Sequence, residues 1–105
     1  MKRVVSDGCV PADHPAFPGH FPSDPVVPGA VLLSMVAEQA ADSLGFPGAR
    51  STWHRVRFFQ PVGPEQPFLI ELDGDRQQFK FRIESTTGAL IANGRCVPRH
   101  ACLSQ

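Results

Sequence analysis

The spacing of hydrophobic residues changes character once along the chain, near residue 48. Before that point, six apolar residues follow the i, i+3, i+4, i+7 spacing of one helix face: Leu33, Val36, Ala37, Ala40, Ala41 and Leu44. Gly45 and Pro47 end the pattern, as expected at a helix C-terminus. The spacing therefore predicts one long and largely buried helix over residues 30–44.

After residue 48 the hydrophobic residues alternate with polar ones, which is typical of half-buried strands. Four such stretches, separated by short turns, cover residues 51–59, 68–72, 78–84 and 89–97. They predict an antiparallel meander, and residues 2–10 predict a further short or interrupted strand. One helix packed on one face of a curved antiparallel sheet is an α+β layout.

Prolines set the segment before the helix apart. The chain has eleven, and six of them fall within residues 11–28. Proline removes a backbone donor and fixes φ, so this density excludes a helix or a central strand there. Because Phe17, Phe21, Val26 and Val27 alternate with the prolines, we expect an ordered, extended loop packed on the domain rather than a flexible linker.

Length and charge limit the class of protein. The 105 residues predict a single domain over 1–105, with the loop at 11–28, the helix at 30–44 and a polar tail at 99–105. Ten basic and ten acidic residues give zero formal charge, which argues against nonspecific nucleic-acid binding. With no signal peptide and no membrane span in the pattern, we expect a soluble, cytoplasmic protein. A short chain with 42% apolar residues also favours a homo-oligomer.

The three cysteines stand far apart and form no CxxC pair, which argues against a disulfide framework and a metal site. The best candidate for chemistry is His20, between Pro18 and Pro22 and shortly before the start of the helix at Gly29. An imidazole is a general base near neutral pH, and the free N–H groups of a helix N-terminus can hold an oxyanion. The alternative is that His20 only packs or caps.

Two motifs carry a resemblance to a known family. The segment DHPAFPGHFPSDPVVPGAVLL, followed by Arg57-Phe58-Phe59-Gln60-Pro61-Val62, resembles the signature of the beta-hydroxyacyl-acyl-carrier-protein dehydratases, enzymes of fatty-acid synthesis. The resemblance covers residues from about 10 to 72. It implies the hot-dog fold, in which a curved antiparallel sheet wraps a long central helix, and this agrees with the layout predicted from the hydrophobic pattern.

The resemblance also implies roles for individual residues. The catalytic histidine falls on His20, and the glycine whose N–H polarises the thioester carbonyl falls on Gly29. The second catalytic residue of the family, a carboxylic acid on the helix, falls on Ser34. A hydroxyl cannot replace it as a general acid at neutral pH.

Three interpretations of this departure stay open. Glu38, one helical turn further on, supplies the carboxyl group through a shifted substrate or a water. Alternatively, Ser34 orients a water for slow dehydration or for thioester hydrolysis. In the third, the site binds an acyl thioester without turning it over. The alternative to all three is that neither residue takes part in chemistry. Ser34 would then be a small polar residue tucked against the sheet, and Glu38 a solvated or interface charge.

Further expectations concern the substrate. Eight residues are expected to contact the acyl thioester: Phe21, Val27, Pro28, Ala30, Leu33, Ala37, Phe58 and Phe59. Strict alternation places Arg55 and Arg57 on one strand face with Trp53, and His54 on the other with Val56 and Phe58. Together with Arg50, the two arginines form a candidate basic patch for the phosphopantetheine phosphate or an acidic carrier protein.

The expected function is therefore that of a hydro-lyase which converts a 3-hydroxyacyl thioester into the 2-enoyl product. The resemblance implies acyl carrier protein or CoA as the carrier, a homodimer or a higher assembly of dimers, and no metal or redox cofactor. A thioesterase and a noncatalytic subunit that binds acyl carrier protein are the alternatives.

Overall fold

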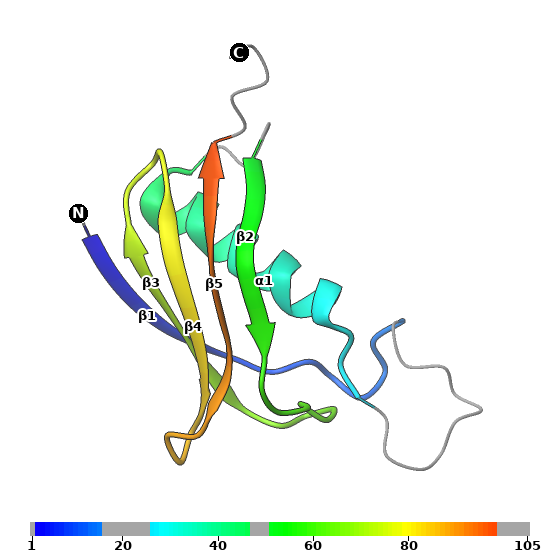
Figure 1. Ribbon diagram of the computed structural model, residues 1–105. Helices are drawn as coiled ribbons and strands as arrows, with labels where there is room; N and C mark the ends of the chain where they lie inside the picture. Colours follow the sequence, from blue (N-terminus) through cyan, green and yellow to red (C-terminus); the bar gives the residue numbers. More distant parts are fainter. Residues whose placement is uncertain (1, 16–25, 47–50, 99–105) are drawn as a thin grey trace.

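The structure, a computed structural model, describes residues 2–15, 26–46 and 51–98. It contains one helix and five strands in the order β1 (Lys2–Gly8), α1 (Gly29–Leu44), β2 (Ser51–Phe58), β3 (Phe68–Gly74), β4 (Phe79–Ser85) and β5 (Leu90–Pro98). Figure 1 shows α1 lying across one face of a twisted, curved sheet. The predicted α+β fold, one helix on an antiparallel sheet, is confirmed.

The strands are ordered β1-β3-β4-β5-β2, and all neighbours are antiparallel. Only β3, β4 and β5 form a meander, so the expectation of four consecutive neighbouring strands is wrong. β2 instead pairs with β5, and residues 59–67 carry the chain from this edge of the sheet to β3. Short-range alternation predicts strands but contains no information on which strands pair.

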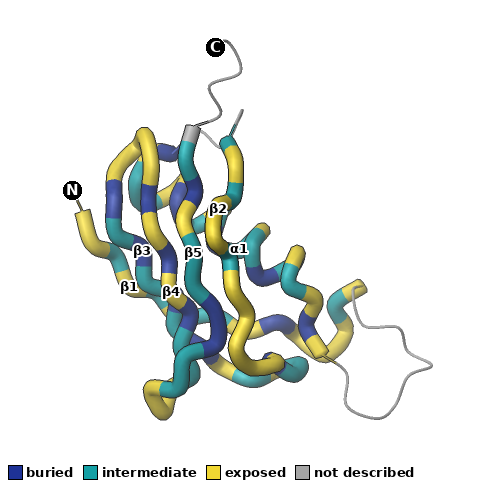
Figure 2. Tube along the Cα trace, viewed as in Figure 1, coloured by how far each residue is buried: buried dark blue, intermediate teal, exposed yellow. Residues whose placement is uncertain are grey.

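The core lies between α1 and the sheet face turned toward it. Burial alternates strictly along β3 and over the first five residues of β4, with Phe68, Leu72 and Ile83 almost fully buried (Figure 2). Near the C-terminal end of α1, Phe46 packs edge-on against Phe79, with ring centroids 4.9 Å apart. Edge-on pairs of this kind add to the stabilisation from burial.

The helix begins and ends close to the predicted positions, and Gly45 takes the left-handed conformation that ends it (φ 70°). Its buried residues are Leu32, Val36 and Ala40, while Ala41 is exposed and Leu33 and Ala37 are half-buried. Val36 and Ala40 of the expected stripe are thus buried as predicted, but Leu32 and not Leu33 continues the buried face, and the helix is not largely buried in a single chain.

A β-bulge in β2 changes which of its side chains share a face. The pairing with β5 shifts register between His54 and Arg57, and Arg55 has a positive φ of 53°. Trp53 and Val56 therefore both pack against the core. The expectation that Arg55 and Arg57 lie on the same face as Trp53 is wrong, because one extra residue inverts the alternation.

Within the part of the chain that the structure describes, no helix has the length and apolar character needed to cross a membrane.

Candidate active site

The start of α1 presents a backbone donor at the predicted position. Pro28 caps the helix in an extended conformation, and its carbonyl accepts hydrogen bonds from Val31 and Leu32. Gly29 is the first helical residue, so its N–H has no acceptor within the helix. The positive end of the helix dipole lies at the same place.

An open groove of about 400 Å³ surrounds this helix start. Three segments line it: the residues just before α1, the start of α1, and the end of β2 with the loop that follows it. The lining residues are Val26, Val27, Gly29, Leu32, Phe58, Phe59, Gln60, Pro61 and Val62. Four residues predicted for the site, Val27, Gly29, Phe58 and Phe59, are thus brought together. The lining is mostly apolar, which suits a hydrocarbon chain.

Phe58 and Gly29 are in direct contact. A Cβ atom placed on Gly29 would lie 2.7 Å from Cζ of Phe58, so only a glycine allows the ring to lie this close. Phe58 is nevertheless half exposed, as are Phe59 and Val26. An apolar surface of this kind, beside a backbone donor that has no acceptor among the described residues, is typical of a binding site.

The loop between β2 and β3 holds the described parts of the proline-rich segment from both sides. The amide of Val27 donates a 2.7 Å hydrogen bond to the carbonyl of Val62. Further along the same loop, Glu65 donates its amide to Val10 O (2.7 Å) and accepts the amide of Ala12 on Oε2 (3.0 Å). Sequence reasoning missed this anchoring role and recognised residues 61–67 only as a turn.

Ser34 and Glu38 lie on the opposite side of α1 from its buried residues. Both are exposed, as is Ala30, and these three positions form one stripe along the helix. Among the described residues, neither the Ser34 hydroxyl nor the Glu38 carboxylate has a hydrogen-bond or ion-pair partner. The interpretation of Ser34 as a residue tucked against the sheet is therefore wrong.

Several predicted site residues lie elsewhere. Pro28, Ala30, Leu33 and Ala37 are on or near α1 but do not line the groove. His20, Phe21 and Arg50 lie outside the described residues. Leu32 and Val62 line the groove and were missed, and for Leu32 the signal was its spacing to Val36 and Ala40.

The two described arginines of the predicted patch are on the outer face of the sheet, away from α1. Arg57 pairs with Asn93. Arg55 lines an open depression of about 390 Å³ whose charged residues are both basic and acidic: Lys80, Arg82, Arg95, Glu71 and Asp73. His54, which pairs with Arg95, lies on this face too. The bulge thus places all three basic residues of β2 on one side.

A long helix on a curved antiparallel sheet, with an apolar groove at the helix N-terminus, is the arrangement of the hot-dog fold. A family model described as ApeI-like, ApeI dehydratase, matches residues 1–95. The chain belongs to the ApeI-like dehydratase family. This confirms the resemblance, and with it the expected fold and dehydratase class.

Relatives named 3-hydroxyacyl-[acyl-carrier-protein] dehydratase FabZ are similar over most of the chain. The one from Acidovorax sp. (strain JS42) is 32% identical and aligns 87% of this chain with 72% of its own length. The one from Roseiflexus sp. (strain RS-1) is 30% identical, with 91% and 71% aligned.

Two solved structures share the fold. The dehydratase heterocomplex ApeI:P from Xenorhabdus doucetiae matches with a TM-score of 0.76 at 23% identity, over 90% of this chain and 85% of that one. An (R)-hydratase from A. caviae matches with a TM-score of 0.65 at 16% identity, over 92% and 94% of the two chains.

Proposed function

We propose that this protein dehydrates a 3-hydroxyacyl thioester to the 2-enoyl thioester. The observation that carries the proposal is the N–H of Gly29, which has no acceptor among the described residues and opens a helix at the edge of an apolar groove. A thioester oxygen held at this N–H gains stabilisation as negative charge develops on it. The groove beside it takes the acyl chain.

In this reaction His20 removes a proton from C2, and the C3–OH bond breaks as the C2–C3 double bond forms. The departing hydroxide takes up a proton and leaves as water. Ser34 and Glu38 are the polar residues of the exposed stripe on α1, and of these only Glu38 can act as the acid. Because Glu38 is one helical turn beyond Ser34, about 5.4 Å along the axis, a water between carboxyl and substrate completes the path.

The substrate is carried by acyl carrier protein, as the names of the FabZ relatives support. We also propose that two copies pair along the free edge of β2. That edge ends at Phe58, whose half-exposed ring would be covered by a partner, as would Phe59 and Val26. As the resemblance to the dehydratases implies, the histidine and the helix carboxylate of one site would come from different chains of such a dimer.

The test is a single-turnover assay with a purified 3-hydroxyacyl carrier protein. We expect the 2-enoyl product from the native protein and none from His20→Ala. Glu38→Gln should also lose activity, while Asp42→Asn, a matched change in an exposed carboxylate of the same helix, should keep it. If native protein and His20→Ala both leave the substrate unchanged, the hydro-lyase proposal is wrong.

A second candidate is a subunit that binds the acyl chain while another hot-dog chain supplies the acid. Ser34 at the carboxylate position favours it, and a similar solved structure is a dehydratase heterocomplex. Its test is co-purification with a chain that carries a helix carboxylate, followed by an assay of the mixture. Dehydration that needs both chains supports this candidate, and full activity of the single chain rules it out. Release of free thiol in the same assay would instead identify a thioesterase.

A further inference from the structure

The β2–β3 loop, residues 59–67, is held in shape by prolines and by hydrogen bonds of its own. Every third residue from position 61 to position 67 is a proline, which fixes its own φ. Gln66 closes the turn between them, because its side-chain oxygen accepts the amide of Gly63 (3.0 Å) and its own amide bonds to the Gly63 carbonyl (3.4 Å). The loop is therefore a stiff support for whatever it holds.

This loop holds both described ends of the proline-rich segment. At one end, Glu65 bonds to Val10 through its amide and to Ala12 through its carboxylate. At the other end, the carbonyl of Val62 accepts the amide of Val27. Because the two holding residues are only three positions apart in the loop, both ends of the segment lie against one short piece of chain.

Glu65 keeps a backbone conformation that is unfavourable for its residue type. Its φ is 63°, in the left-handed region that glutamate rarely adopts. A glycine would take up this conformation without strain, but it would lack the carboxylate that accepts the Ala12 amide. Residues held in such conformations cluster at functional sites, where the surrounding structure compensates for their cost. The conformation and the side-chain bond together indicate that the carboxylate has a role beyond closing a turn.

We propose that Glu65 is a positioning residue for His20, the base of the proposed dehydration. This inference rests on the proposed function and adds how its base is held. A general base must lie within hydrogen-bond reach of the proton it removes, and a misplacement of about 1 Å can lower the rate about 100-fold. Glu65 does not line the groove, so it acts on the rate through the chain that it fixes at Ala12, ahead of His20.

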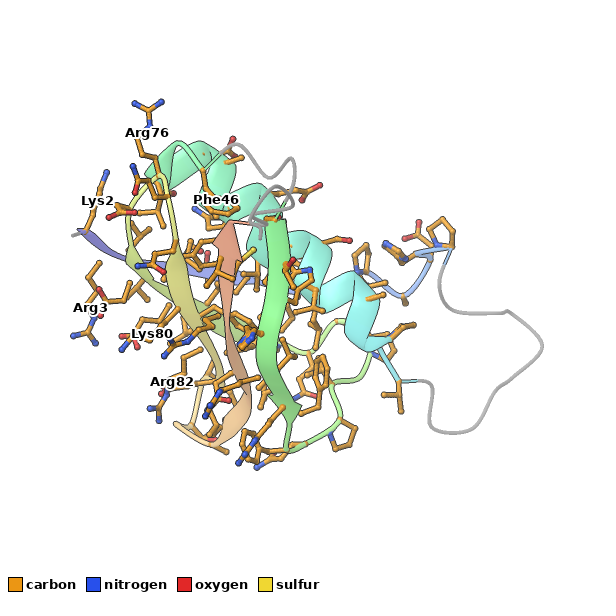
Figure 3. The ribbon with its side chains drawn as sticks, turned by 45° about the horizontal axis from the view of Figure 1, so that its top comes forward. Lys2, Arg3, Phe46, Arg76, Lys80 and Arg82 are labelled. Carbon is orange, nitrogen blue, oxygen red and sulfur yellow. The ribbon has the colours of Figure 1, made fainter. Side chains whose placement is uncertain are left out.

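Asp75 supplies a matched control at the other end of the sheet. Its exposed carboxylate also accepts backbone amides, those of Gln77 (2.8 Å) and Gln78 (3.1 Å), in the β3–β4 turn. The seven residues of β3, about 20 Å of strand, separate this turn from the β2–β3 loop. The turn lies beside the last residues of α1, where Figure 3 shows Arg76, whereas the groove lies at the start of the helix.

The first experiment measures kcat and KM with a 3-hydroxyacyl carrier protein. Glu65→Ala should lower kcat about fivefold or more and leave KM within about twofold, because the groove and the Gly29 N–H stay in place. Glu65→Gln keeps an acceptor oxygen and should keep kcat within about twofold. Asp75→Ala loses two hydrogen bonds and should nevertheless keep kcat within about twofold.

Glu65→Gly separates positioning from stability. Glycine relieves the positive φ, so this variant should be more stable in urea than Glu65→Ala. It lacks the carboxylate, so its kcat should be as low as that of Glu65→Ala. A kcat that follows stability across the variants would overturn the inference. So would an unchanged kcat in Glu65→Ala, or an equal loss in Asp75→Ala.

The second experiment observes the His20 imidazole by NMR and requires no turnover. Its ring signals are assigned by their absence in His20→Ala. They should move in Glu65→Ala and Glu65→Gly and stay in place in Asp75→Ala. Signals that stay in place in both Glu65 variants would overturn the inference, even if kcat falls. If the signals move as expected but the native protein turns over no substrate, the dehydratase proposal fails and the positioning of His20 by Glu65 stands.

Discussion

The carboxylate of Glu65 accepts a 3.0 Å hydrogen bond from the amide of Ala12, a residue 53 positions earlier in the chain. The backbone amide of Glu65 bonds to Val10 as well. Two bonds from one residue therefore fix the chain where it leaves β1 and enters the proline-rich segment that contains His20.

Glu65→Ala should lower the free energy of unfolding by about 1 kcal/mol, since it removes one charge-assisted but exposed hydrogen bond. Glu65→Gln keeps an acceptor oxygen and should lose less than about half of that. Glu65→Gly loses the bond but relieves the positive φ of 63°, so it should be less destabilising than alanine. Urea unfolding measures all three. Identical values for alanine and glutamine would mean that the carboxylate does not anchor the loop.

Gly29→Ala should displace the Phe58 ring. The clash at 2.7 Å involves the far end of a half-exposed side chain, so the ring can turn away and the fold should survive. Turnover should fall, because the new methyl group stands beside the N–H that receives the thioester oxygen. Tryptic mapping and thermal unfolding check the fold, and product formation checks the site.

The double variant Gly29→Ala/Phe58→Leu separates the two causes of that loss. A smaller side chain at position 58 removes the clash but leaves the methyl group beside the donor. If the loss comes from the clash alone, Phe58→Leu should restore activity to Gly29→Ala. Activity that stays low locates the effect at the Gly29 N–H.

Ser34→Glu should raise the rate of dehydration tenfold or more, because it puts a carboxylic acid at the position where related dehydratases are expected to carry one. Position 34 is exposed, so stability should change by less than about 0.5 kcal/mol. Ser34→Gln, of matched size without the acid, should give no gain. If the rate of Ser34→Glu equals that of the native protein, departure of the substrate's 3-hydroxyl group does not limit turnover.

The two described cysteines should differ in reactivity. Burial raises the pKa of the Cys96 thiol, and a hydrogen bond from Ser51 offsets part of the rise. Since the thiolate is the reactive form, iodoacetamide at pH 8 should modify exposed Cys9 well before Cys96. Mass spectrometry of peptides from the native protein measures the two rates, and equal rates would contradict the buried position of Cys96.

The same pKa shift has a consequence for stability. When the pH rises above the ordinary thiol value of 9.0, Cys96 ionises in the unfolded chain but stays protonated in the folded one. The free energy of unfolding should therefore fall with pH in this range. Cys96→Ala should show a shallower decline between pH 8 and 10 in urea titrations. Parallel declines would show that other groups cause the loss.

Local patterns predicted the elements of this fold better than their arrangement. Strict alternation in Phe79-Lys80-Phe81-Arg82-Ile83 identified β4, because each apolar residue there is buried in the core and each basic residue is exposed to solvent. In β2 the same rule failed, since a bulge at Arg55 depends on pairing with β5 rather than on the residues of β2 themselves. The position of β2 at the edge of the sheet was not predicted either, because it too depends on pairing with β5.

The candidate site was predicted in part. Gly29 and Phe58 were recognised from motifs, and their direct contact follows from the long-range placement of β2, which no local pattern encodes. Leu32 was missed because Leu33 also fits the helical spacing to Val36 and Ala40. The roles of Val62 and Glu65 depend on backbone hydrogen bonds, which a sequence does not display.

The sheet order also dictates when the fold can form. β1 has a single neighbour, β3, and the partners of Lys2 to Gly8 are Gly74 to Phe68. During synthesis, the first strand therefore leaves the ribosome long before the residues that complete its hydrogen bonds. Closing so long a loop costs entropy before any contact compensates for it, which slows folding. Until β3 is synthesised, Val4 lacks the core against which it packs in the folded protein, so the nascent chain exposes this apolar residue to solvent.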